Sequence, residues 1–553
     1  MAIRLTEARG FECASHHLVM FGGAGGQHAC SIATTLGIRR IIIPRLSSLL
    51  SAYGMALADV VREMTEPAAF TISKNKDNEA ISTRMASLVE KAEADLRSQG
   101  FPADRMSSET YLNCRYSGSS TQLMIEKPED GDYKKRFFDE HKREFGFNLS
   151  QRDILVDDIR VRAVGKSVSQ ETRSPYKDFD QAKRRDCNAG RFGKKQVYFD
   201  GPGWMNTAVV PLRELSNGEQ VRGPAIIFDD TQTILVEPSH LATSLPEHVV
   251  LDLVEEKVVK QKIDLNDLEH VDPVQLSVYG HRLMGIAEQM GDILRKISIS
   301  INIKERLDYS CAIFAADGGL VANAPHIPCH LGAMSHAVRH QARIHGDTLQ
   351  EGDVLLSNHP AAGGSHLPDL TVITPAFHEG KIIFWTAARA HHADIGGIRA
   401  GSMPPFSKEL WEEGAQMKSF KLVKSGKFDE EGIIKILSEE PAQYPGCSGT
   451  RTISDNLSDL HAQVAACHRG VVFINALVAE QSLVVVQYYM HAIMRTAERA
   501  VRDLLRHVNK KFGGKPLEAI DWLDDGTALR LKITIDEKDG SAEFDFTGTS
   551  AQV

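Results

Sequence analysis

The chain of 553 residues lacks the features that identify several large classes of protein. Its 8 cysteines are scattered and contain no C-x-x-C pair, which excludes a dense disulfide framework and suits a reducing cytosol. The formal net charge of −9 is mild for this length and gives no basic footprint for nucleic acid or an anionic membrane. No run of about 18 apolar residues appears, so the sequence predicts no membrane span.

What is present is the composition of an ordinary soluble protein, with 42% hydrophobic and 25% charged residues. A chain of this length can bury several cores, so about three or four domains are expected. The sequence contains no internal repeat and no low-complexity segment. Evidence on function therefore has to come from local motifs.

The segment 365–392 is the most informative part of the chain. Leu370–Phe377 and Lys381–Ala390 are rich in β-forming residues. The residues between them, 378–380, form a three-residue turn that contains Gly. Together they predict a single β-hairpin.

The register of this hairpin decides which polar side chains meet at its open end. Pairing Phe377 with Lys381 makes Asp369 and His391 diagonal neighbours on one face. His366 then lies just beyond the start of the first strand. Two imidazoles and a carboxylate that converge in this way predict a divalent-metal site, formed by His366, Asp369 and His391, with open positions for water or substrate.

Two alternatives remain open for this segment. A two- or four-residue turn would direct His392 toward the carboxylate instead of His391, because neighbouring strand residues face opposite ways. The chain also has 22 His, so histidines that only make hydrogen bonds within the fold are the alternative to a metal site.

Long Gly- and Pro-rich segments flank the hairpin at 352–364 and 393–405, which is typical of binding loops on a rigid scaffold. In the second of them, Asp394 is a candidate fourth ligand, an orienting partner of a ligand, or a general base. Upstream, His326 and His330 have the i, i+4 spacing of a helical metal pair. Prolines 325 and 328 predict a loop there instead of a helix.

A glycine-rich loop near the start of the chain is a second candidate site. A predicted strand over His17–Phe21 enters Gly22–Gly26, and a predicted helix over Gln27–Leu36 and a strand over Arg40–Pro44 follow. Such a unit suits a phosphate, because glycine lets backbone N–H groups approach an anion at a helix N-terminus. A tight packing turn is the equally common alternative.

Other segments show clear patterns without a site. The sequence predicts helices over 78–100, 130–145, 272–298 and within 456–508, strands over 110–116, 157–164, 196–199, 225–236 and 311–315, and an exposed loop over 173–195.

Six longer motifs carry a family resemblance. The second half of the chain resembles the hydantoinase B family, and the first half resembles the C-terminal part of the hydantoinase A family. An A part fused to a B part in one chain is similar to the eukaryotic-type 5-oxoprolinase family. The B motifs are N-A-P-H-I-P-C-H-L-G-A-M, N-H-P-A-A-G-G-S-H-L-P-D-L-T-V-I-T-P, R-A-H-H-A-D-I-G-G-I-R-A-G-S-M-P-P and C-S-G-T-R-T-I-S-D-N-L-S-D-L-H-A-Q-V-A-A, and the A motifs are M-F-G-G-A-G-G-Q-H-A-C and L-L-S-A-Y-G-M-A-L-A-D-V-V-R-E.

The resemblance implies a multidomain α/β and α+β fold. Residues 1–65 would end an actin- or sugar-kinase-like domain, and 66–255 would form a β-rich C-terminal region of the A family. A linker would cover 256–271, and a mixed α+β hydantoinase B domain with long helices would cover 272–553. Both ends resemble the interior of the family protein, so we expect an internal fragment that alone shows no ATP-dependent ring opening.

The function implied by the resemblance is ATP-dependent hydrolysis of 5-oxo-L-proline to L-glutamate, a step of glutathione turnover. ATP with Mg would bind mostly outside this chain. In the B part, a divalent metal would activate water. Asp394 or His330 would then be the candidate base, and Arg389 the candidate ligand of the substrate carboxylate. The kinase-like fold assigns nucleotide contact to Gly22, Gly23, Gly25 and Gly26.

Two other functions stay open. A hydantoinase or an ATP-dependent ketone carboxylase shares the same two-part plan, and an inactive truncated product or scaffold is the non-enzymatic alternative. The expected partners are a small lactam and a second copy of the chain in a homodimer, with no nucleic acid and no membrane, in the cytosol.

Overall fold

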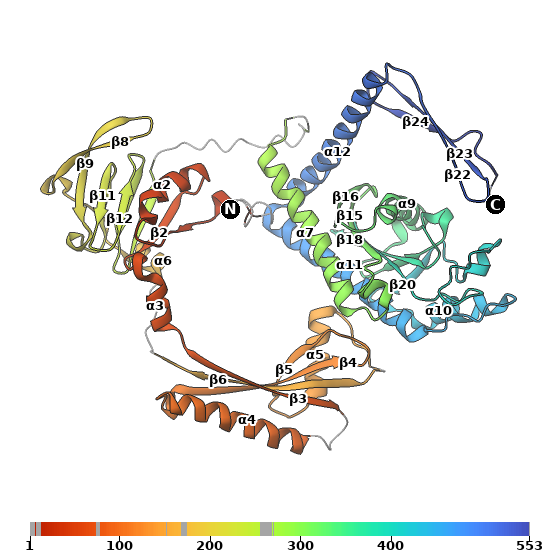
Figure 1. Ribbon diagram of the computed structural model, residues 1–553, viewed down its shortest axis with the longest axis horizontal. Helices are drawn as coiled ribbons and strands as arrows, with labels where there is room; N and C mark the ends of the chain where they lie inside the picture. The colour runs from red at the N-terminus through yellow and green to blue at the C-terminus, as the bar shows by residue number, and fades with distance from the viewer. Residues whose placement is uncertain are drawn as a thin grey trace. The chain divides into compact units, whose positions relative to one another are not determined.

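The computed structural model describes residues 6, 11, 13–72, 78–150, 152–167, 174–254, 268 and 270–551. The chain divides into two compact units, Met1–Lys262 and Ile263–Val553. Helices and several β-sheets occur in both units, which agrees with the mixed α and β class expected from the sequence (Figure 1). The predicted linker over 256–271 lies mostly outside the described residues.

The first unit opens with the βαβ element that the glycine pattern predicts. Strand β1 (Leu18–Val19) pairs in parallel with β2 (Arg40–Pro44), and α2 (Gly25–Thr35) connects them. Strand β2 also pairs with β14 (His248–Leu253), so the two ends of this unit share one sheet. That sheet has the order β1-β2-β14-β13-β10-β7 and includes β13 (His240–Ser244), β10 (Glu219–Arg222) and β7 (Arg185–Asp186).

A second sheet of four strands contributes to the same hydrophobic core as the six-stranded sheet, and residues of α2 are buried in that core. Ala29 and Ala33 of α2 are buried with Ile41 from the first sheet and Ile234 from the second. The second sheet has the order β12-β11-β9-β8, formed by β12 (Thr233–Val236), β11 (Ala225–Phe228), β9 (Gly203–Pro211) and β8 (Lys194–Phe199).

The segment 173–195, predicted to be an exposed loop, is partly regular, so that prediction is wrong. It contains helix α6 (Pro175–Gln181), strand β7 and the start of β8. Pro175 occupies the first turn of α6, where its fixed φ favours a helix. Phe179 is buried, and the guanidinium groups of Arg40 and Arg184 both stack on its ring. The polar composition of the segment gave no indication of this buried aromatic residue.

A separate core within the first unit forms where two helices pack on a third sheet. Helix α4 (Asn78–Ser98) contacts the strands of this sheet, and α5 (Tyr133–Phe145) packs beside its edge. The side chain of Asp132 accepts a hydrogen bond from the Lys135 amide and caps α5. The sheet has the order β3-β6-β4-β5, formed by β3 (Val60–Thr71), β6 (Ile154–Gly165), β4 (Met106–Tyr116) and β5 (Leu123–Glu126).

The second unit is built on a seven-stranded antiparallel sheet. The predicted helix over 272–298 is observed as α7 (Pro273–Ile297), and Asp272 caps it by accepting hydrogen bonds from the Val274 and Gln275 amides. The sheet has the order β16-β15-β19-β18-β17-β20-β21, formed by β16 (Leu320–Asn323), β15 (Tyr309–Ala315), β19 (Lys381–His391), β18 (Asp369–His378), β17 (Val354–Ser357), β20 (Phe420–Lys424) and β21 (Lys427–Phe428).

Different helices cover the two faces of this sheet. Helix α9 (Pro328–His345) shares a core with Trp385 and Ala387 of β19. On the other face, Thr386 of β19 donates a hydrogen bond to the Cys467 carbonyl of helix α11 (Ile453–Gln481). Because strand residues alternate, odd-numbered residues from Trp385 to His391 face α9 and the even-numbered residues between them face α11.

Helix α11 belongs to the core of the second unit. By length and composition it could cross a membrane, and half of its most apolar stretch is buried. It packs against α7, β18 and β19, as a core helix does. Helix α12 (Leu483–Lys511) and a three-stranded sheet complete the unit, the latter formed by β22 (Leu517–Trp522), β23 (Ala528–Ile535) and β24 (Ala542–Asp545).

Candidate metal centre

The hairpin predicted around the candidate site is present, but its register differs from the prediction. The turn has two residues, because His378 pairs with Lys381. Glu379 and Gly380 have φ of 49° and 77°, as a type I′ turn requires. A bulge between the Ala376 and Phe377 pairs then shifts the register by one more residue.

These two changes preserve which residues share a face. A two-residue turn alone would have placed His392 on the same face as Asp369. The bulge shifts the register by one more residue, so His391 is again on the face of Asp369. Asp369 therefore lies directly opposite His391, where the sequence predicted Arg389 opposite Asp369 and His391 on the diagonal. The predicted neighbours were right, and the predicted spacing along the strand was wrong by two residues.

The structure brings His366, Asp369 and His391 together at the open end of the hairpin. Nδ1 of His391 lies 2.7 Å from Oδ1 of Asp369, and Nδ1 of His366 lies 3.1 Å from Oδ2. The ligand atoms of the three residues all lie within 4.8 Å of one another. Among the described residues this is the one such group of at least three His, Cys, Asp or Glu side chains.

His330 joins this group from helix α9. Its Nε2 lies 3.4 Å from Oδ2 of Asp369, and its Nδ1 lies 3.3 Å from the Ser310 hydroxyl. The predicted loop at this position is wrong, because Pro328 occupies the first turn of α9, where proline is tolerated. His326 remains outside the helix and accepts a hydrogen bond from the Cys311 amide.

Asp308 is a second carboxylate that the sequence did not single out. Its Oδ1 lies 3.8 Å from Nε2 of His330, and its Oδ2 lies 3.9 Å from Nδ1 of His391. Its side chain is one-third exposed, whereas that of Asp369 is fully buried. Asp308 precedes β15, and its position follows from the pairing of β15 with β19. No local motif marks it in the sequence.

The buried carboxyl group of Asp369 is held in its ionised form. Burial by itself would raise its pKa, but hydrogen bonds from His330, His391 and the His366 amide lower the pKa well below its usual range. A permanently charged carboxylate beside imidazoles is a chemically suitable set of donors for a divalent transition-metal ion.

His392 lies on the opposite face and belongs to a different network. Its Nε2 lies 2.9 Å from Oε1 of Gln463, and its Nδ1 accepts a hydrogen bond from the side-chain Nδ2 of Asn456 at 3.1 Å. Both partners lie on α11. Burial lowers the pKa of His392, which favours the neutral ring that this pattern needs. His392 is therefore turned away from Asp369.

Asp394 lies in a separate polar cluster. Its carboxylate accepts from the Gly396 amide at 2.8 Å and pairs with Arg451 at 2.8 Å. The Ser402 hydroxyl also donates to it, at 3.3 Å. These contacts hold the loop that follows the hairpin, and the role of Asp394 as a general base stays a prediction.

Backbone conformation and close packing require glycine at several positions of the glycine-rich loop in the first unit. Gly22 has a φ of +92°, which favours glycine. A Cβ atom at Gly23 would lie 2.9 Å from the Thr231 carbonyl oxygen, and one at Gly26 would lie 2.8 Å from that of Thr233. Gly25 leaves more room, with 3.4 Å to a methionine methyl group. Nucleotide contact by these four glycines stays a prediction.

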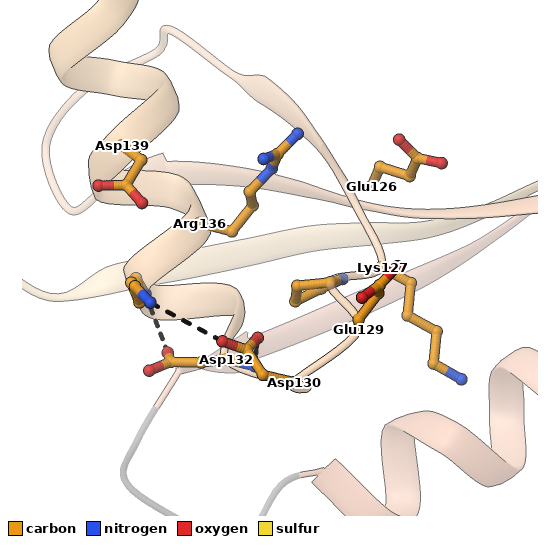
Figure 2. A pocket seen from close by; sticks show the side chains of 9 residues that line it. Glu126, Lys127, Glu129, Asp130, Asp132, Arg136 and Asp139 are labelled. Atoms are coloured by element: carbon orange, nitrogen blue, oxygen red, sulfur yellow. Dashed lines mark hydrogen bonds and ion pairs between the residues drawn. The ribbon is translucent and has the colours of Figure 1, made fainter.

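A surface pocket beside α5 contains none of the predicted site residues. Figure 2 shows its mainly acidic lining, which includes Asp130 and Asp132. The Lys135 ammonium pairs with Asp130, and the Lys135 backbone amide donates to Asp132. These contacts cap and stabilise the start of α5. The other lining residues are Glu126, Lys127, Pro128, Glu129, Arg136 and Asp139.

The fold and the side chains define two α/β and α+β units, the second of which carries a histidine and carboxylate cluster at a strand end. Comparison with known families matches residues 272–553 to "Hydantoinase B/oxoprolinase". Residues 1–64 match "Hydantoinase/oxoprolinase", and 159–256 match its C-terminal domain. The chain belongs to the hydantoinase B/oxoprolinase family.

Curated relatives cover nearly all of this chain. The chain is 45% identical to 5-oxoprolinase 1 of Arabidopsis thaliana, over 100% of this chain and 44% of the relative. It is 44% identical to the 5-oxoprolinase of Saccharomyces cerevisiae, over 99% of this chain and 43% of the relative. The chain thus spans less than half the length of these relatives.

Among solved structures, the ATP-dependent caprolactamase of Pseudomonas jessenii is similar, with a TM-score of 0.43 and 28% identity over 50% of this chain and 46% of that chain.

Proposed function

We propose that the second unit holds a divalent metal ion with His366, Asp369 and His391. The observation that carries this proposal is the convergence of two imidazoles and one ionised carboxylate within 4.8 Å. These donors suit zinc, manganese or iron better than calcium, which prefers oxygen ligands. Full burial of Asp369 and exposure of His366 give the group one closed side and one side that a ligand can reach.

We further propose that the site serves hydrolysis of a cyclic amide, driven by ATP in the full-length protein. The substrate we propose is 5-oxo-L-proline and the product is L-glutamate, which is supported by relatives named 5-oxoprolinase. Likeness to the "Caprolactamase subunit beta", 31% identical over 44% of this chain, supports the broader class of lactams. Water oxygen enters the new carboxylate, and the ring nitrogen leaves as an amine.

The side chains around the cluster suit this reaction. A five-membered lactam is a resonance-stabilised amide with a poor leaving group, and a bound divalent ion would supply Lewis acidity toward its carbonyl oxygen or toward water. Asp308 faces His330 and His391 from the more exposed side, so it is placed to accept a proton from an attacking water. His330 lies between the two carboxylates and orients both of them. The proton that Asp308 accepts from water then returns to the ring nitrogen as it leaves as an amine.

ATP would be used in the first unit and in the remainder of the full-length protein. The βαβ element with its Gly22–Gly26 turn supports a nucleotide contact, because α2 begins at the end of that turn. The homodimer and the cytosolic location remain parts of this proposal and rest on the family resemblance.

Metal analysis of purified variants tests the proposed centre. The wild-type chain is expected to bind about one divalent ion, and His366→Ala, Asp369→Ala and His391→Ala should each lower affinity by roughly 10-fold or more. His378→Ala is the matched control, because it removes an exposed histidine at the other end of the same hairpin. Equal metal content in all variants would refute the metal centre.

A substrate panel tests the proposed reaction. The full-length protein, with ATP and Mg, is offered 5-oxo-L-proline, hydantoin, caprolactam, and acetone with bicarbonate. We expect glutamate formation coupled to ATP hydrolysis with the first compound. Turnover of acetone or hydantoin in place of 5-oxo-L-proline would reassign the activity within the family.

A further inference from the structure

Arg389 lies under the candidate metal centre, at the middle of several hydrogen bonds. It is a fully buried residue on the α9 face of β19, two positions before His391. Nε donates to the Thr371 hydroxyl at 2.7 Å, and Nη1 donates to the Ser365 hydroxyl at 2.9 Å. The same guanidinium donates to two backbone carbonyls, those of Gly363 at 2.6 Å and His330 at 3.4 Å.

Each acceptor lies in a segment that carries a residue of the cluster. Ser365 directly precedes His366, and Thr371 lies two residues after Asp369 on the same strand face. The His330 carbonyl belongs to a residue of the cluster itself. One guanidinium therefore connects the loop before β18, strand β18 and helix α9 to strand β19.

The chemistry of this environment suits arginine and leaves little opportunity for a substrate carboxylate. All four acceptors are neutral protein groups, and a substrate anion would have to displace them. The arginine side chain keeps its charge at neutral pH. The planar fork of five donors can serve divergent acceptors at once, which a lysine ammonium on one flexible stem cannot.

We propose that Arg389 is a positioning residue of the metal centre and not the ligand of the substrate carboxylate. Its hydrogen bonds fix the relative positions of the segments that carry His366, Asp369, His330 and His391. The inference rests on the proposed function because that function supplies the metal ion. The ordering of the segments by Arg389 does not depend on a metal. It replaces the role that the sequence suggested for Arg389.

Hydrogen exchange tests the ordering without any metal. We expect Arg389→Lys to speed exchange of the amides in 358–368 and in the first turn of α9 by roughly 10-fold or more, because those segments lose their fixed donor. Exchange within α7 should stay unchanged. Arg282→Lys is the matched control, since Arg282 forms a bidentate pair with Glu480 in the same unit and lies outside the cluster.

Metal affinity gives the second readout. Titration with Mn²⁺ or Zn²⁺ should show a Kd raised roughly 10- to 100-fold in Arg389→Lys and unchanged in Arg282→Lys. Ser365→Ala keeps the arginine and removes one acceptor, so it should raise Kd by a smaller factor of roughly 3 to 10. That milder variant keeps the test informative if Arg389→Lys does not fold.

The outcomes separate this inference from the proposed function. Unchanged exchange and unchanged Kd in Arg389→Lys and Ser365→Ala, with only KM for the lactam raised in the full-length protein, would overturn the positioning role. Faster exchange in Arg389→Lys, with a wild-type chain that binds neither ion, would support positioning and refute the metal centre.

Discussion

Gln463 offers a quantitative test of how α11 holds the open end of the hairpin. It is fully buried, and its Oε1 accepts the Nε2–H of His392 at 2.9 Å. Its amide nitrogen donates to the carbonyls of Leu370 in β18 and Ala388 in β19, both at 2.8 Å. One side chain therefore joins α11 to both strands, directly behind Asp369 and His391.

Replacement of Gln463 by leucine keeps the volume and removes all three interactions. A buried polar group left without a partner costs about 1–3 kcal/mol. The His392 ring loses its only acceptor for Nε2–H among the described contacts, and two carbonyls lose one donor each. We expect Gln463→Leu to lower the free energy of unfolding of the second unit by about 2–5 kcal/mol, a large share of a typical total of about 5–15 kcal/mol.

The assay must follow the second unit by itself, since a chain with two units need not unfold in one step. Hydrogen exchange of the peptides that cover β18 and β19, measured across a urea series, gives that unit's free energy. Gln481→Leu changes an exposed glutamine near the end of the same helix and should stay within about 0.5 kcal/mol of wild type. A loss below about 1 kcal/mol in Gln463→Leu would refute the reasoning that this amide fastens α11 to the sheet.

Two further predictions concern the first unit. Burial lowers the pKa of His141 from 6.5 to about 4, so its neutral ring stabilises the fold above pH 6.5 and this stabilisation, at most about 3 kcal/mol, is lost as pH falls toward 4. Urea unfolding of His141→Leu between pH 7 and 4 should show a flatter pH dependence than wild type, and an equal slope would contradict this assignment. Gly26→Ala should lower the unit's stability by about 1–3 kcal/mol, because the new Cβ meets the Thr233 carbonyl at 2.8 Å. Gly25→Ala is the control, because a Cβ there would lie 3.4 Å from the nearest atom, the Met20 methyl group. An equal loss of unfolding free energy in the two variants would contradict the packing role of Gly26.

Local patterns were enough to predict the hairpin and the identity of its converging residues. Leu370–Phe377 and Lys381–Ala390 are observed within β18 and β19, and the odd and even positions separate His391 from His392 as the sequence predicted. The spacing along the strands was not predictable, because a shorter turn and a bulge compensated each other. A bulge depends on packing across the sheet and has no reliable local signal.

Long-range contacts account for what sequence reasoning missed. Asp308 reaches the cluster because β15 pairs with β19, and the two segments are about 80 positions apart in sequence. For Arg389, the prediction of a substrate ligand rests on the fit of a guanidinium to a carboxylate, and it stays untested. The protein acceptors that the fold places around Arg389 are the reason why we propose a positioning role instead. Pro328 was interpreted as a helix breaker, but it begins α9.

Location of the metal by anomalous X-ray diffraction tests the central claim most directly. Crystals of the protein grown with Mn²⁺ or Zn²⁺ should show one strong anomalous peak about 2.0–2.3 Å from donor atoms of His366, Asp369 and His391. The Nε2 and Nδ1 atoms of His392 should lie outside that sphere, still bonded to Gln463 and Asn456. A peak at His392, a peak elsewhere in the second unit, or none at saturating metal would contradict the proposed centre.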